Sequence, residues 1–152
     1  MRDWIKMEKL KWCLNQKNGI ELVEPNENLS RAYSKDSDDD LIAMEATNGK
    51  WKIVTAYYAC YHAFYSLLQK AGIRCEIHDC TLELMKFFDF NTDDLLFMQR
   101  LKSDRVAVQY YLEKNKPLDS SKIKAFILKC KNLSRNLTED KIKHIRSKVK
   151  ND

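Results

Sequence analysis

Residues that interrupt helices are scarce in this chain. Only three glycines and two prolines occur among its 152 residues, whereas a β-sandwich needs many Gly- and Pro-rich turns. Apolar residues instead recur at intervals of three and four, which is the pattern of amphipathic helices. We therefore predict an all-α protein, an antiparallel up-and-down bundle of about five or six helices. Its length suits a single domain over residues 1–152.

The segment 51–71 gives the strongest helical pattern. One face carries Ile53, Tyr57, Cys60, Phe64 and Leu67, and a second carries Tyr58, Tyr61 and Tyr65. A helix that is apolar nearly all round is buried on several sides, at the centre of the bundle or between the core and a subunit interface. Because this small chain has to bury both faces, we predict a homodimer with Tyr58, Tyr61 and Tyr65 in or just beneath the interface.

An alternative use of these aromatic residues is the stacking of nucleotide bases. Stacking requires exposed rings beside basic residues, but there is no Lys or Arg between Thr55 and Gln69. We therefore interpret the cluster as core and interface.

Residue types at the segment boundaries predict where the helices begin and end. Gly19 and Gly72 are expected to end helices, and the polar run 34–40 (SKDSDDD) is expected to weaken the second helix, because Ser and Asp compete for backbone hydrogen bonds. The expected N-cap residues are Asn26 or Asn28, then Asp79 or Thr81, then Thr92 and Thr138.

Charge and cysteine content indicate the cellular setting. No apolar run reaches the ~20 residues of a membrane span, and the charged N-terminus does not resemble a signal peptide. We expect a cytoplasmic protein without a membrane partner, whose five cysteines are reduced thiols. The net charge is +5, with a basic helix at about 138–150 that is either a solvated helix face or a surface for phosphate groups.

Motifs for catalysis or metal binding are not evident. The sequence contains no Gly-rich phosphate loop, no His-Glu-x-x-His and no Gly-x-Ser-x-Gly. Cys75, His78 and Cys80 offer three ligands, but a closed zinc site needs four. A Cys–His nucleophilic pair in the same segment also lacks any sign of an activated thiol. We predict neither a metal nor a cofactor.

Arg105 is the most informative charged residue. It lies between Leu101 and Val108 on the apolar stripe of the helix predicted over 93–114, which continues to Tyr111 and Leu112. A guanidinium on an inward face needs a carboxylate, phosphate or carbonyl partner. Asp104 and the acidic run are candidate partners, so Arg105 either forms a structural ion pair or binds a ligand.

These segments together resemble a known family. The stretch WKIVTAYYACYHAFYSLLQKAGIRCEIHDCTLELMKFF, followed by RVAVQYY, resembles the HEPN domain (higher eukaryotes and prokaryotes nucleotide-binding), especially its small stand-alone archaeal members. The resemblance covers roughly residues 20–145. The matching residues are Ala56, Tyr57, Tyr58, Ala59, Leu67, Leu68, Gly72 and His78, then Arg105, Val108, Gln109 and Tyr110.

The resemblance implies an antiparallel helical bundle that dimerises. Many members are encoded beside a small nucleotidyltransferase as part of a toxin–antitoxin pair, and active members are metal-independent ribonucleases with an Arg-x(4–6)-His motif. No arginine of this chain has a histidine at that spacing, and Arg105 is followed there by Tyr110, Tyr111 and Leu112. Catalytic residues are therefore not assigned. The candidates for a polar pocket that binds nucleotide or RNA are Arg105, Asp104, Gln109, Tyr110 and His78.

Three functions remain open from the sequence. The first is a dimeric, non-catalytic HEPN module that binds RNA, a nucleotide or a partner such as a nucleotidyltransferase. The second is a metal-independent ribonuclease that uses Arg105 with a displaced base such as His78. The third is a helical scaffold in a larger complex.

Overall fold

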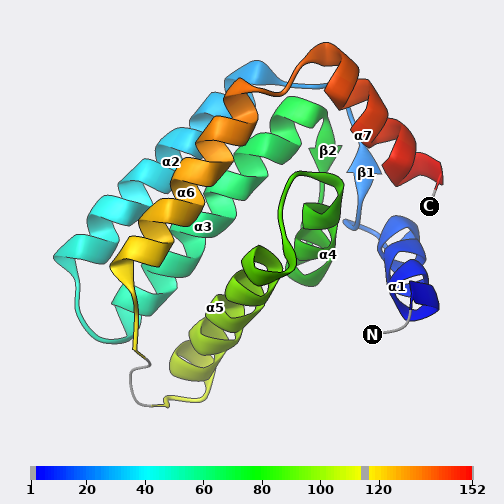
Figure 1. Cartoon of the computed structure of the whole chain (residues 1–152). Helices are drawn as coiled ribbons and strands as arrows, with labels where there is room; N and C mark the ends of the chain where they lie inside the picture. Colours follow the sequence, from blue (N-terminus) through cyan, green and yellow to red (C-terminus); the bar gives the residue numbers. More distant parts are fainter. Residues whose placement is uncertain (1–2, 114–116, 152) are drawn as a thin grey trace.

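The chain folds as a helical bundle around one central helix. The computed structural model describes residues 3–113 and 117–151, and these contain seven α-helices, a short 3-10 helix and a two-stranded antiparallel sheet. Four long helices, α2, α3, α5 and α6, run alternately up and down (Figure 1). The all-α, up-and-down prediction is confirmed.

The elements follow one another with short links. Their bounds are α1 Asp3–Asn15, β1 Glu21–Leu22, α2 Glu27–Ala46, α3 Lys50–Ala71, β2 Ile73–Arg74, α4 His78–Glu83, η1 Leu84–Phe87, α5 Thr92–Tyr110, α6 Ser120–Arg135 and α7 Glu139–Asn151. The predicted helix over 93–114 reaches into residues 114–116, which lie outside the described part of the chain.

Helix α3 is the centre of the core. Helices α2, α5 and α6 all pack against it, and most of its side chains are buried, Tyr57, Phe64 and Leu67 completely. Burial of Leu- and Phe-sized side chains contributes about 1.5–3 kcal/mol each. The central position is one of the two alternatives that the apolar pattern of 51–71 left open, the other being a position between the core and a subunit interface.

Helix α2 continues unbroken through the acidic run 34–40. The predicted weakening there is wrong, because side chains of the run bind α3 and do not compete for the backbone of α2. The Ser37 hydroxyl donates to the Ala59 carbonyl at 2.6 Å, and an Asp40 carboxylate oxygen lies 2.7 Å from Nδ1 of His62.

Several helix ends differ from the expectation by a few residues. Asn26, one of the two predicted candidates, caps α2, but Asn91 and not Thr92 caps α5, in a capping box with Asp94. Neither Asp79 nor Thr81 caps α4, which begins after Ile77 without a side-chain cap.

The C-terminal end of α5 comes earlier than predicted. The helix ends at Tyr110, and Leu112 has a left-handed backbone conformation with φ 53°. Tyr111 and Leu112 are consequently exposed and are not part of the apolar stripe. The prediction that they continue this stripe is wrong.

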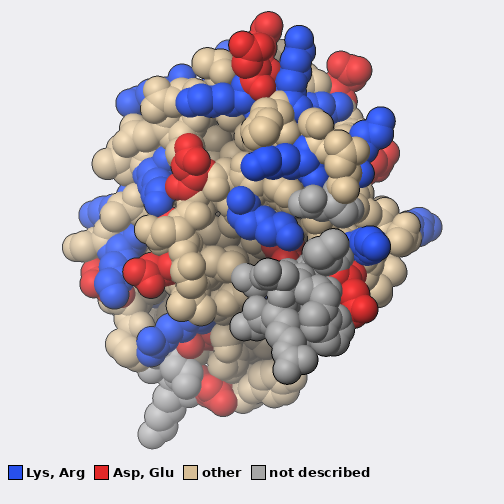
Figure 2. All heavy atoms as spheres, turned by 45° about the vertical axis from the view of Figure 1, so that its right-hand side comes forward, with Lys and Arg blue, Asp and Glu red and all other residues tan. Residues whose placement is uncertain are grey.

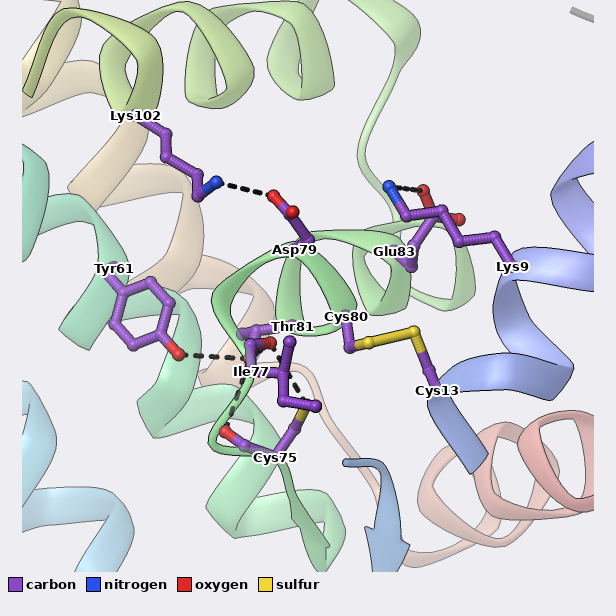
Figure 3. The surroundings of a disulfide bond; sticks show 10 residues. All are labelled: Lys9, Cys13, Tyr61, Cys75, Ile77, Asp79, Cys80, Thr81, Glu83 and Lys102. Atoms are coloured by element: carbon purple, nitrogen blue, oxygen red, sulfur yellow. Dashed lines mark hydrogen bonds and ion pairs between the residues drawn. A yellow bond between two sulfur atoms is a disulfide. The ribbon is translucent and has the colours of Figure 1, made fainter. Parts of the chain in front are cut away.

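Two cysteines form a disulfide, so the prediction of five reduced thiols is wrong. Cys13 of α1 is bonded to Cys80 of α4, with their Cα atoms 5.6 Å apart (Figure 3). The packing of α1 against α4 brings together two residues that are 67 positions apart. Cys60, Cys75 and Cys130 are free and buried.

The C-terminal helix is basic, as predicted, but one of its basic residues is structural. Nη1 of Arg146 donates hydrogen bonds to three carbonyl oxygens, those of Val23 at 2.7 Å, Ala71 at 3.1 Å and Gly72 at 2.6 Å. Two of these carbonyls end α3, where a cation also interacts favourably with the helix dipole. The other basic residues of α7, Lys141, Lys143, Lys148 and Lys150, are exposed.

Substitution Arg146→Met should destabilise the protein by about 2–3 kcal/mol, because it leaves partly buried carbonyl groups without a charged donor. Urea unfolding monitored by circular dichroism measures the change. Lys148→Met, on the exposed side of the same helix, is the matched control and should change stability by less than about 0.5 kcal/mol. Equal effects of the two substitutions would contradict the structural role of Arg146.

Candidate functional site

Arg105 lies within a cluster of aromatic residues between α3 and α5. Only 8% of its surface is exposed. Its guanidinium carbon is 4.8 Å from the ring centre of Tyr57 and 5.6 Å from that of Tyr58, both on α3. Nη1 donates to Gln109 Oε1 at 3.2 Å and lies 3.5 Å from the Tyr58 hydroxyl. The ring centre of Tyr110 is 6.0 Å away.

Arg105 carries a charge that no ion pair with a described residue balances. None of the ion pairs between described residues involves Arg105. Its buried Nε has no hydrogen-bond partner among residues 3–113 and 117–151. Cation–π contacts contribute about 0.5–2 kcal/mol each and compensate only part of the cost of burying a cation. The Nε–H donor therefore lacks a partner but is itself buried, so an anion reaches it only when the neighbouring side chains move.

Asp104 does not belong to this cluster. It lines a separate groove with Arg100, Leu118 and Lys122. Successive residues of a helix point about 100° apart, so neighbours in sequence do not share a face. The prediction that Asp104 lies near Arg105 as its partner is wrong, whereas Gln109 and Tyr110 do lie beside it.

His78 joins the same cluster from the start of α4. Its Nδ1 is 2.8 Å from the Tyr57 hydroxyl, and its ring stacks on Tyr61 with ring centres 4.3 Å apart. Burial, and then the positive charge of Arg105, lower the pKa of His78 to about 4. The imidazole is therefore neutral at physiological pH, which avoids a second charge next to Arg105.

A histidine–carboxylate pair lies beside this cluster and is not among the residues predicted from sequence. His62 of α3 is paired with Asp40 of α2, and the His62 ring centre is 5.6 Å from that of Tyr58. Both members of the pair are half-buried. The position of His62 one turn after Tyr58 was visible in the sequence, but its partner lies 22 residues earlier.

The tyrosine face predicted as a dimer interface is largely covered within one chain. Tyr61 is 6% and Tyr65 is 7% exposed. The Tyr61 hydroxyl is 3.0 Å from Oγ1 of Thr81, and the Tyr65 hydroxyl accepts from the backbone N–H of Cys75 at 3.0 Å. Burial raises the pKa of both tyrosines. Only Tyr58 is half-exposed, so the chain itself buries both faces of α3, and the dimer remains a prediction.

A cleft of about 420 Å³ lies between α1, α4 and α5. Two ion pairs line it, Lys102 with Asp79 at 2.6 Å and Lys9 with Glu83 at 3.6 Å, and Figure 3 shows both pairs around the disulfide. The cations of this cleft are thus neutralised by carboxylates. On the face turned forward in Figure 2, basic and acidic side chains are likewise interspersed.

The segment around His78 contains no assembled metal site. Among residues 3–113 and 117–151, no three His, Cys, Asp or Glu residues are grouped as metal ligands. Cys80 is engaged in the disulfide and Cys75 donates to the Ile77 carbonyl at 3.4 Å.

Comparison with protein-family models, with curated proteins and with solved structures finds no match for this chain. Within the described residues, none of the helices has the length and apolar character needed to span a membrane.

The pKa of His78 can be measured by following its ring protons by NMR, and we expect a midpoint near pH 4. Because the folded protein holds a pKa below the ordinary value of 6.5, the unfolded chain binds more protons between these pH values. This contribution to stability is complete above about pH 6.5 and is lost as the pH falls toward 4. The full shift corresponds to roughly 3 kcal/mol, which solvent screening of this half-exposed ring reduces to on the order of 2 kcal/mol. The variant His78→Gln should lack this part of the pH dependence of urea unfolding, and an ordinary midpoint near 6.5 in wild type would contradict the prediction.

Proposed function

We propose that this chain is a HEPN-type module that binds a nucleotide or single-stranded RNA, with Arg105 contacting a phosphate group. The proposal rests mainly on one observation: the Arg105 guanidinium is buried, has an Nε without a partner and is not ion-paired to any described residue. A planar guanidinium engages two phosphate oxygens together through Nε and a terminal nitrogen. The phosphate would supply the missing negative charge.

The end of α5 supports a ligand that carries a base. Tyr110 is 65% exposed and Tyr111 is 74% exposed, and the ring of Tyr110 lies beside the Arg105 guanidinium. An exposed aromatic ring adjacent to a cation is the arrangement that stacks unpaired bases, at about 1–3 kcal/mol per base. The Gln109 amide holds Arg105 from the same helix.

The remaining parts of the proposal follow from the family resemblance. They are dimer formation and association with a small nucleotidyltransferase in a toxin–antitoxin-like system. With both faces of α3 buried in one chain, we place the dimer contact on residues around the half-exposed Tyr58. Sedimentation at micromolar concentration tests dimer formation, and a monomer would contradict it.

The binding proposal is tested by fluorescence anisotropy with a labelled ten-nucleotide RNA and, as a competitor, ATP, at one fixed low salt concentration. Arg105→Lys should weaken binding at least tenfold, because lysine lacks the planar fork. Tyr110→Ala, at an exposed position that leaves the core unchanged, should weaken binding about 5- to 100-fold through loss of stacking. Arg100→Lys, an exposed arginine on the same helix, is the control and should bind like wild type. Unchanged affinity of both test variants would refute the proposal.

A second candidate is metal-independent cleavage of RNA with a displaced base. The observation that favours it is the His62–Asp40 pair, in which a carboxylate orients an imidazole close to Tyr58 and hence to Arg105. His78, which sequence reasoning favoured as the displaced base, is neutral but weakly basic because of its low pKa. Cleavage of RNA in the presence of EDTA by wild type, and its loss in His62→Gln, would support this activity; intact RNA after prolonged incubation would exclude it.

A further inference from the structure

A second, separate polar groove lies between α2 and α6. It encloses about 300 Å³, at the lower end of the ~300–1,000 Å³ typical of small-molecule sites. Most of its lining comes from the N-terminal part of α2 and the C-terminal part of α6, which also lie next to each other in Figure 1. Its polar lining comes from Arg31 and Ser34 of α2 and from Lys131, Ser134 and Arg135 of α6.

The base of this groove is lined by small side chains, which leave space above them. Ser30 of α2 and Ser66 of α3 exchange hydrogen bonds: each hydroxyl donates to the backbone carbonyl of the other residue, at 2.8 and 2.7 Å. This pairing holds the two helices close, and Ala63 adds no bulk beside it. The space left above them is walled by the longer side chains of α6.

The charge of the groove is positive. Among the described residues, three cations line it, against one carboxylate, that of Glu27. Arg31 donates to the neutral Asn28 amide oxygen at 2.6 Å, and Lys131 is paired with Asp38 outside the groove at 2.6 Å. Arg135 takes part in no ion pair with another described residue. The two arginines therefore keep their charge available.

We propose that this groove is a phosphate-ester site, in which Arg31 and Arg135 engage the phosphate oxygens. The Ser34 and Ser134 hydroxyl groups point to the same chemistry, since serine hydroxyls donate to phosphate oxygens alongside arginine. Lysine and serine side chains around a free pair of arginines select a doubly or singly charged anion over a neutral ligand. The phosphate belongs either to a free nucleotide or to the backbone of RNA.

The groove is distinct from the Arg105 cluster. Ser66 follows Tyr57 by about two and a half helical turns, so the two residues lie on opposite sides of α3. The proposal therefore goes beyond the binding function proposed for Arg105. Either site can be present without the other.

The test is a titration of the full-length protein with inorganic phosphate, AMP and a ten-nucleotide RNA, followed through amide NMR shifts and calorimetry. Some of these probes are expected to shift the Ser34 and Ser134 amides of wild type. The double variant Arg31→Gln/Arg135→Gln should bind those probes at least tenfold more weakly. Arg100→Gln/Lys11→Gln removes the same charge at exposed positions outside the groove and should leave this affinity unchanged. In wild type, the amides of Ser34 and Ser134 should shift on titration.

The outcomes distinguish a free nucleotide from RNA as the source of the phosphate, and they distinguish binding in the groove from binding at Arg105. Shifts at Ser34 and Ser134 with AMP indicate a free nucleotide, and shifts with RNA alone indicate a nucleic-acid backbone. Retention of these shifts in Arg105→Met shows that the groove acts independently of the first site. The proposal is overturned if no probe shifts these amides, or if both double variants lose affinity equally.

Discussion

Loss of the Cys13–Cys80 disulfide should lower the free energy of unfolding by about 4 kcal/mol, the largest single change that we expect for this protein. A crosslink between residues 67 positions apart removes much of the conformational entropy of the unfolded chain, and the loop-closure relation gives this magnitude. The bond also fixes α1, whose Leu10 is completely buried, to α4. Urea unfolding of wild type and of Cys13→Ser/Cys80→Ser, without reductant, measures the difference.

The reductant itself provides the matched control. Wild type should become less stable in dithiothreitol, whereas the double serine variant, which retains only Cys60, Cys75 and Cys130, should not change. Thiol titration of the denatured, non-reduced protein should find three free thiols out of five cysteines. Five free thiols in protein purified without reductant, together with unchanged stability in dithiothreitol, would contradict the account of α1.

Replacement of Arg105 by methionine should leave the stability of the ligand-free protein unchanged or raise it by up to about 2 kcal/mol, while binding of RNA falls at least tenfold. A buried cation without an acidic partner is costly, and an apolar side chain of similar length removes that cost. Methionine also retains favourable contacts with the rings of Tyr57 and Tyr58. Thermal melting and RNA anisotropy on the same preparation measure both effects.

The opposite result, lost stability with unchanged RNA binding, would assign Arg105 a structural role. Breaking a buried ion pair costs about 3–5 kcal/mol, so a comparable loss of stability in Arg105→Met, with RNA affinity unchanged, would show that the guanidinium holds the bundle together. Gln109→Leu provides a control on the same helix, because it removes only the amide that orients Arg105. We expect this variant to weaken RNA binding by a smaller factor than Arg105→Met does.

The helical architecture was predictable because local patterns determine it. The apolar residues of 51–71 recur on nearly every side of a helix, which leaves a central position as the stable solution, and Asn26 and Gly72 have the chemistry of helix ends. The run 34–40 was misjudged for the same reason: local propensity disfavours a helix there, but Ser37 bonds across to α3, and tertiary contacts override propensity.

The candidate site was predictable only in part. A charged residue on an apolar stripe identified Arg105 without any knowledge of its neighbours. The choice of Asp104 as its partner failed, because adjacent residues of a helix point in different directions. The His62–Asp40 pair and the Cys13–Cys80 bond join distant segments, and such contacts follow from packing and not from spacing in the sequence.

The most direct measurement of the central claim is an NMR observation of the Arg105 Nε–H group. The variant Arg105→Lys assigns its signal by removing it, and RNA or AMP is then titrated into wild type. We expect the Arg105 Nε–H signal to move downfield on saturation, as a donor without a partner acquires a phosphate oxygen, while the signal of exposed Arg100 stays in place. An Arg105 Nε–H signal that is unchanged by saturating RNA and by saturating AMP would contradict the claim that Arg105 binds phosphate.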